Sequence, residues 1–126
     1  MDIQRIRTEV AQALNSFGVL EVRGTSDGSG VFAKAGLQTS VGNLYIVQIN
    51  FPNYPYQMPH VGITQPALRS DSPHRYTTGN ICYLHPSMWN PGVHNLTFVL
   101  GRAAKWLNKY EVWRAKGRWP GAQLAH

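Results

Sequence analysis

The chain has 126 residues, of which 43% are hydrophobic and 14% charged, which fits one folded domain over residues 1–126 and excludes a disordered chain. No apolar run approaches the ~18–20 residues of a membrane span, and the first residues lack the basic-then-apolar order of a secretion signal. A single cysteine, Cys82, excludes an intrachain disulfide and a four-cysteine zinc site, and makes a reducing cytoplasm the expected setting. The formal net charge of +6 comes entirely from residues 64–126, because the charges of residues 1–63 sum to zero.

The first 64 residues predict one helix followed by a series of strands. Apolar residues at three- and four-residue steps indicate an amphipathic helix over about residues 2–17, with Gly18 where a left-handed cap belongs. Alternating or β-branched runs predict strands at residues 19–23, 31–35, 44–51 and 60–64, and the glycine-rich residues 24–30 predict a loop. This order favours an α+β domain with an antiparallel meander.

The remainder predicts a long irregular segment and a second helix. Residues 65–95 show little periodicity, which in a small domain is typical of a functional loop. Asn95 is suited to cap a helix whose apolar stripe runs from Leu96 to Tyr110. A short basic tail follows over residues 111–126, in which residues 111–116 predict a brief helix.

The irregular segment contains the only thiol, in the sequence Gly79-Asn80-Ile81-Cys82. A lone cysteine often packs as a small buried hydrophobe, and the residue by itself leaves that interpretation open. The context favours chemistry, because Gly79 permits a tight backbone approach and His74 and His85 are near in sequence.

Four short motifs surround this thiol in a fixed order. They are Phe51-Pro52, Tyr54-Pro55, Met58-Pro59 and Val61; Ser72-Pro73-His74; Gly79-Asn80-Ile81-Cys82; and Trp89-Asn90-Pro91. Together they resemble the YPxxPPxV turn, HPN tripeptide, GxIC nucleophile motif and WxP motif of the ubiquitin-conjugating enzyme (UBC) family. The resemblance covers about residues 2–110 and implies a UBC-like fold: an N-terminal helix, a strand meander, a long active-site loop and a second helix, with a truncated C-terminus.

The chain departs from the family pattern in the tripeptide. Ser72 and His74 stand where the family has histidine and asparagine. This change and the short C-terminus resemble bacterial members, some of which are encoded in antiphage CBASS operons beside a cGAS-like nucleotidyltransferase. The resemblance implies a transferase without a cofactor. It would carry a protein with a C-terminal glycine, either a ubiquitin-like protein or that nucleotidyltransferase, as a thioester on Cys82 and pass it to an amine. An activating enzyme would be a further partner.

The resemblance also implies roles for individual residues. Cys82 would be the nucleophile, and His74 takes the position of the asparagine that stabilises the oxyanion. An imidazole can donate an N–H there and can also accept a proton near neutral pH, although a purely structural histidine remains an alternative. Asp71 could orient the imidazole, and Glu111 occupies a position where the family sometimes has an acid near the thiol. Both could equally be surface charges.

A metal site is the weaker interpretation of the same segment. Cys82, His74, His85 and His94 include three imidazoles and one thiolate, a possible zinc set. A thiolate bound to zinc is lost as a nucleophile, however, so we expect no metal.

The charge asymmetry predicts a basic surface after the nucleophile segment. It comprises six side chains: Arg102, Lys105, Lys109, Arg114, Lys116 and Arg118. We expect them to attract an acidic protein partner or its acidic tail. Two alternatives remain: a catalytically silent UBC-like interaction module, disfavoured by the intact cysteine, and a nucleic-acid-binding domain, suggested by a pI near 9.8 but lacking any recognised binding motif.

Overall fold

The structure is a computed structural model that describes residues 2–17, 19–24 and 30–121. Apart from one short 3-10 helix, its elements follow the order predicted from the sequence. They are helix α1 (Ile3–Ala13), strands β1 (Val19–Gly24), β2 (Val31–Gln38), β3 (Leu44–Asn50) and β4 (His60–Gln65), the short 3-10 helix η1 (Pro86–Met88) and helix α2 (Leu96–Lys116). Neither α1 nor α2 combines the length and the apolar character needed to cross a membrane, and this holds for the described residues.

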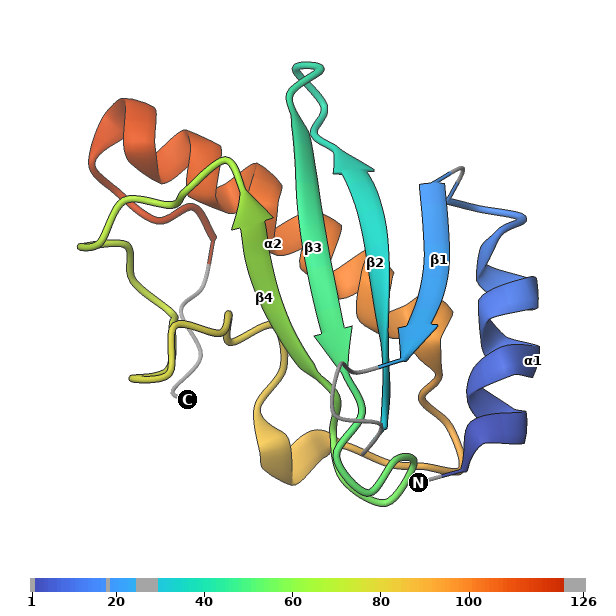
Figure 1. Ribbon diagram of the computed structural model, residues 1–126. Helices are drawn as coiled ribbons and strands as arrows, with labels where there is room; N and C mark the ends of the chain where they lie inside the picture. The colour runs from blue at the N-terminus through green and yellow to red at the C-terminus, as the bar shows by residue number, and fades with distance from the viewer. Residues whose placement is uncertain (1, 18, 25–29, 122–126) are drawn as a thin grey trace.

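The four strands form one antiparallel sheet in the order β1-β2-β3-β4, which confirms the predicted α+β class and its meander. Helix α2 crosses one face of the sheet, while α1 lies beside β1 and also contacts α2 (Figure 1). The long segment between β4 and α2 runs beyond the β4 edge of the sheet (Figure 1). The sheet and α2 therefore form a frame beside which this segment is held.

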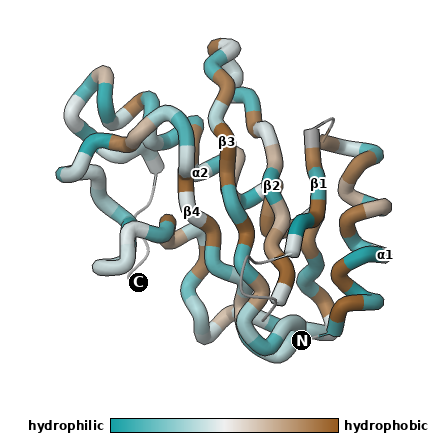
Figure 2. Tube along the Cα trace, in the orientation of Figure 1, coloured by the Kyte–Doolittle hydropathy of each residue, from teal (hydrophilic) through white to brown (hydrophobic). Residues whose placement is uncertain are grey.

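The core lies between the sheet and α2. Strand β3 alternates strictly, with Tyr45, Val47 and Ile49 buried and their neighbours more exposed, as a strand with one covered face requires. In Figure 2, β2 and β3 show mainly hydrophobic residues interrupted by hydrophilic ones. The predicted stripe of α2 is buried throughout: Leu96, Val99, Leu100, Ala103, Leu107 and Tyr110.

Both helices differ in extent from their predictions. Helix α1 ends at Ala13 rather than near residue 17, and Leu14 beyond it is 46% exposed, so a longer helix would bury little more. Residues 111–116 form no separate helix, because α2 continues without a break to Lys116. It ends at Gly117, whose φ of 74° suits glycine and whose N–H donates to the Trp113 carbonyl. Gly18 and most of the predicted loop at 24–30 lie outside the described residues.

A buried carboxylate joins three parts of the fold. Glu9 of α1 is only 6% exposed and accepts hydrogen bonds from the Tyr54 hydroxyl and the Arg5 guanidinium. It also accepts from the backbone N–H of Leu96, at 2.7 Å. Glu9 therefore ties α1 to residues 51–59, which we call the proline-rich turn, and to the first turn of α2. The predicted Asn95 cap is confirmed as well, since its side chain accepts from the Phe98 N–H at 2.9 Å.

Candidate active site

The thiol lies at the end of a short backbone hairpin over residues 74–82. The Cys82 N–H donates to the His74 carbonyl at 2.8 Å, and the Tyr76 N–H donates to the Asn80 carbonyl at 2.9 Å. Gly79 turns the chain with a φ of 93°, a conformation that favours glycine. The hairpin thus fixes the residue at the tripeptide position and the cysteine side by side through their backbones.

This hairpin is attached to the outer edge of β4. The Ile81 N–H donates to the Val61 carbonyl at 2.9 Å, and the Ile81 side chain is 1% exposed. Beside this bond, a Cβ on Gly62 would lie 3.1 Å from the Asn80 side-chain oxygen, tighter than an ordinary contact. The absence of a side chain at Gly62 therefore allows the hairpin to pack closely on the strand.

The thiol is sheltered rather than exposed. A nucleophile must be accessible to its substrate, but Cys82 is 6% exposed, and burial raises the pKa of its thiol. The Tyr76 hydroxyl is also buried and forms no hydrogen bond of regular geometry with a described residue. It lies close enough to the sulfur to favour the thiolate, which lowers the Cys82 pKa and offsets part of the effect of burial.

The His74 backbone is held from two sides. Its φ is 60°, in the left-handed region, and its carbonyl accepts from both the Cys82 N–H and the Trp106 indole N–H, the latter at 3.2 Å. Its imidazole packs against Trp119, with 4.7 Å between ring centroids. Burial, and then the positive charge of Lys109, lower the pKa of the imidazole, so that its neutral form is favoured.

The two acidic residues suggested for the site occupy other positions. Both carboxylate oxygens of Asp71 accept hydrogen bonds from the Arg69 guanidinium, at 3.1 and 2.7 Å. The two side chains form a solvent-exposed ion pair. Glu111 accepts from the Asn43 side chain at 2.6 Å and from the Tyr45 hydroxyl at 2.9 Å. Tyr45 lies toward the end of β3 opposite the end that pairs with Val61, where the thiol hairpin is attached. The structure therefore does not bring Glu111 to Cys82.

The histidines of the suggested zinc set are used locally. The His85 Nδ1 accepts from the Ser87 N–H at 3.2 Å, and the His94 Nδ1 accepts from the Asn90 N–H at 3.0 Å. The His94 ring also stacks on Phe98 at 4.2 Å between centroids. Within the described part of the chain, no group of three or more histidine, cysteine or acidic side chains is assembled that could hold a metal.

The segment after the cysteine is fixed by hydrogen bonds to the proline-rich turn and to α2. The Trp89 indole N–H donates to the Pro55 carbonyl at 2.8 Å, and the Tyr83 hydroxyl donates to the Pro59 carbonyl. Arg102 of α2 donates to the Tyr83 carbonyl at 2.9 Å. Trp89 of the WxP motif therefore helps to hold this segment against the proline-rich turn.

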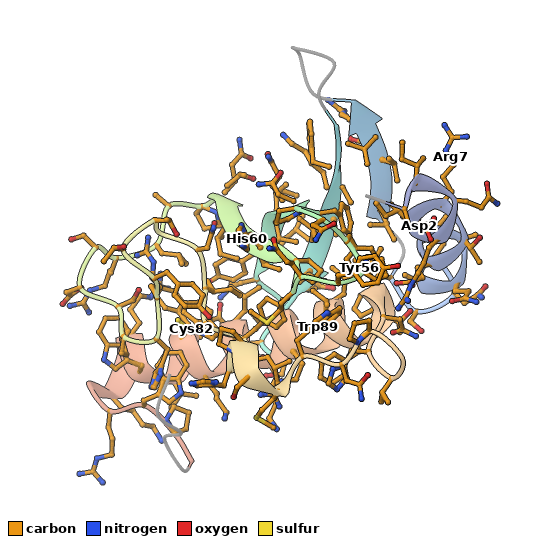
Figure 3. All side chains as sticks on the ribbon, turned by 90° about the horizontal axis from the view of Figure 1, so that it is seen from below. Asp2, Arg7, Tyr56, His60, Cys82 and Trp89 are labelled. Atoms are coloured by element: carbon orange, nitrogen blue, oxygen red, sulfur yellow. The ribbon has the colours of Figure 1, made fainter. Side chains whose placement is uncertain are left out.

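A groove of about 590 Å³ opens between the proline-rich turn, the start of β4 and the hairpin. Its lining is mainly aromatic and aliphatic, with a few uncharged polar groups; it includes Tyr56, Met58, His60, Tyr76, Thr77, Pro86 and Trp89. Figure 3 shows Tyr56, His60 and Trp89, which come from three segments, in this part of the molecule together with Cys82. Because Tyr76 both lines the groove and faces the thiol, the groove lies next to the candidate nucleophile.

The six basic residues divide into two groups. Arg102, Lys105 and Lys109 recur at three- and four-residue steps on α2, and the first two lower the pKa of Lys109 by like-charge repulsion, after the effect of burial. We call these three the basic stripe. Arg102 donates a hydrogen bond to the carbonyl of Tyr83, the residue after Cys82, and the charge of Lys109 lowers the pKa of His74. The stripe therefore adjoins the hairpin. The remaining three, Arg114, Lys116 and Arg118, are exposed at the end of α2 and just beyond it.

Three site residues were not singled out from the sequence: Tyr76, Trp106 and Trp119. Tyr76 lies between two recognised motifs, and its approach to the thiol depends on the turn at Gly79. Trp106 lies three residues after Ala103 and four before Tyr110, so it belongs to the buried face of α2 that the stripe defines, and it is 4% exposed. For Trp119 a signal was present, because Gly117 after a basic last turn marks a helix end, beyond which a large apolar residue often folds back.

Comparison with known structures defines the class. The chain is similar to a chain in a solved complex of the Vps23 UEV with ubiquitin, with a TM-score of 0.60 and 21% identity over 84% of this chain and 83% of the other. The fold is therefore UBC-like, as the motifs implied. Residues 9–126 match the family described as "Type II CBASS E2 protein", and the chain belongs to that family of antiphage CBASS proteins. No curated protein shows significant similarity to the chain.

Proposed function

We propose that this protein is a ubiquitin-conjugating-type transferase in antiphage defence. It would accept the C-terminal acyl group of a protein on Cys82 as a thioester and transfer it to an amine. The carried protein would be a ubiquitin-like protein or a cGAS-like nucleotidyltransferase. The observation that carries the proposal is the hairpin that joins Cys82 to His74, in a chain that belongs to a CBASS E2 family.

The chemistry requires an acyl group that has already been activated, for example as an acyl adenylate made by an activating enzyme. The Cys82 thiolate attacks the carbonyl carbon, a carbon–sulfur bond forms, and the activating group leaves with its electron pair. An amine then attacks the thioester, a carbon–nitrogen bond forms, and the thiolate leaves while the amine loses a proton. Both steps pass through a tetrahedral oxyanion, for which one hydrogen-bond donor contributes about 3 kcal/mol.

His74 is the proposed donor to this oxyanion. Its lowered pKa keeps the imidazole neutral near pH 7, so one ring nitrogen carries a hydrogen and the other can accept one. The same group is thus suited to donate to an oxyanion and to take a proton from the incoming amine. The apolar groove beside Tyr76 is suited to hold an extended peptide segment next to the acyl linkage.

The sheltered thiol supports a second candidate, a catalytically silent UBC-like module that only binds partners. A thiol 6% exposed with a raised pKa is a weak nucleophile at neutral pH until its surroundings open. On this alternative the groove and the basic residues would serve binding alone. The related fold in complex with ubiquitin is compatible with either function.

Capture of an adduct separates the two functions. Cys82→Ser and Cys82→Lys would convert a labile thioester into a more stable ester or amide, and we expect a covalent adduct when each variant is produced with the neighbouring CBASS proteins. Mass spectrometry would identify the attached protein through its C-terminal residue. Cys82→Ala is the matched control and should form none.

Failure to capture any adduct with either variant, while the protein still binds a partner without covalent attachment, would contradict the transferase and favour the silent module. Salt-sensitive binding of DNA or RNA without an adduct would instead favour the nucleic-acid alternative.

A further inference from the structure

The chain folds back on itself after α2. Gly117 ends the helix in a left-handed conformation, and residues 117–121, which we call the return segment, run back along α2 (Figure 1). Gly121 shows how far the segment has returned, because a Cβ at that position would lie 3.8 Å from the Lys109 ammonium nitrogen. The segment thus passes the part of α2 that carries the basic stripe.

Trp119 is the anchor of the return segment. Its side chain is 7% exposed, whereas the flanking Arg118 and Gly121 are exposed. The indole packs against Trp106 of α2, with 5.3 Å between centroids, and against His74, at 4.7 Å and 50° between the planes. A large apolar side chain from the end of the chain therefore covers the imidazole of the candidate active site.

Tryptophans therefore contact both the backbone and the side chain of His74. Trp106 donates to its backbone carbonyl, and Trp119 covers its ring. The two indoles also contact each other, so ring and backbone are fixed by one aromatic cluster. A ring packed on an aromatic face loses rotational freedom, which is the requirement for a preorganised donor.

We propose that Trp119 is a positioning residue that sets the orientation of the His74 imidazole for acyl transfer. The proposal rests on the function proposed for His74, and it adds that the segment after α2 completes the site.

The surroundings of the imidazole bear on the test. The titratable groups of the elements packed around it include Arg75, Tyr76 and Cys82 of the hairpin, Arg102, Lys105 and Lys109 of α2, and Arg118 of the return segment. Among the charged side chains, Lys109 acts on the His74 pKa, and burial has the larger effect. Removing the indole uncovers the ring without changing any of these charges.

The test uses Trp119→Leu, which keeps an apolar side chain, together with Trp119→Ala. NMR titration of the His74 ring should show its pKa rise toward the ordinary value in both variants, with loss of the ring-current shifts caused by the indole. Trp113→Ala is the matched control, because Trp113 contacts Tyr110 of α2 and Arg69 of the segment after β4, and it should leave the His74 signals unchanged. Trp119→Phe should keep most of the wild-type signature.

In the loaded protein, Trp119→Leu should discharge the thioester to an amine at least tenfold more slowly, with Cys82 alkylation unchanged. Unaltered His74 shifts and pKa in Trp119→Leu would overturn the proposal, as would a wild-type rate of discharge. If the wild-type protein forms no thioester at all, the proposed function fails, whereas the NMR comparison still decides whether Trp119 orients His74.

Discussion

The backbone carbonyl of His74 accepts the amide hydrogen of Cys82 at 2.8 Å, so the candidate nucleophile and the residue at the oxyanion position are joined before any substrate arrives. His74 achieves this with a φ of 60°, a region that glycine, asparagine, aspartate and histidine enter more readily than other residues. The family's asparagine and this chain's histidine are therefore alternatives at a position with a special backbone requirement.

The backbone of His74 determines which substitutions are informative. Asparagine tolerates its positive φ and retains a donor, and glycine tolerates it and removes the side chain, whereas alanine would add strain. We expect His74→Gly to slow transfer by about 100-fold, the loss typical of one oxyanion donor.

The pH dependence separates the two roles of His74. If the imidazole is a base, wild-type transfer falls as the pH drops through its lowered pKa, because the protonated ring cannot accept a proton. In that case the transfer rate of His74→Asn, measured from pH 5 to 9, should no longer show this fall at low pH. Equal profiles would exclude the base, and full activity of His74→Gly would exclude both roles.

Tyr76 should control thiol reactivity. Its hydroxyl favours the thiolate, so Tyr76→Phe should raise the already elevated Cys82 pKa further and lower the thiolate fraction at any pH below it. We expect alkylation by iodoacetamide to slow about three- to tenfold at pH 7.5, because the thiolate is the form that reacts. Tyr56→Phe is the control, because Tyr56 is 74% exposed and its side chain should not affect the thiol. A faster reaction in Tyr76→Phe would mean that Tyr76 acts as a steric cover instead.

The basic stripe and the end of α2 can be compared by single charge reversals. Lys105→Glu changes the stripe beside the hairpin, and Lys116→Glu makes the same change at the last residue of α2. If an acidic partner is guided to the site, Lys105→Glu should lower the loading rate about tenfold at low salt and less at high salt, since surface electrostatics are screened.

The end of α2 is tested by combined reversal of Arg114, Lys116 and Arg118, with circular dichroism to confirm the fold. Unchanged loading would identify these three as a solvated surface. Unchanged loading in Lys105→Glu as well would remove charge guidance from the proposed function.

Glu9 should contribute measurably to stability. Glu9→Gln retains the shape but weakens the hydrogen bonds to Tyr54, Arg5 and Leu96, so we expect the free energy of unfolding to fall by about 1–3 kcal/mol. Urea denaturation provides the measurement. Glu21→Gln is the control, because Glu21 pairs with Arg23 in an exposed ion pair, and it should change stability by less than about 0.5 kcal/mol. Equal effects of the two substitutions would contradict the proposed role of Glu9 in linking α1, the proline-rich turn and α2.

The features predictable from the sequence are those set by local periodicity and motif order. The stripe of α2, its Asn95 cap and the alternation of β3 depend on neighbouring residues, and each is found in the structure. The surroundings of the two site residues were not predictable, because Tyr76 reaches the thiol and Trp119 reaches the His74 ring only through the turns at Gly79 and Gly117. Glu111 shows the same limit, since its partners Asn43 and Tyr45 are distant in sequence.

The bond between Ile81 and Val61 has a consequence for the behaviour of the protein in solution. β4 is an outer strand of the sheet, and an outer strand with unpaired backbone groups is a template for pairing with other chains. The hairpin that carries Cys82 occupies one of these groups, so the candidate reactive segment also shields the sheet from self-association. Substitutions that loosen the hairpin to expose the thiol should therefore increase aggregation along with reactivity.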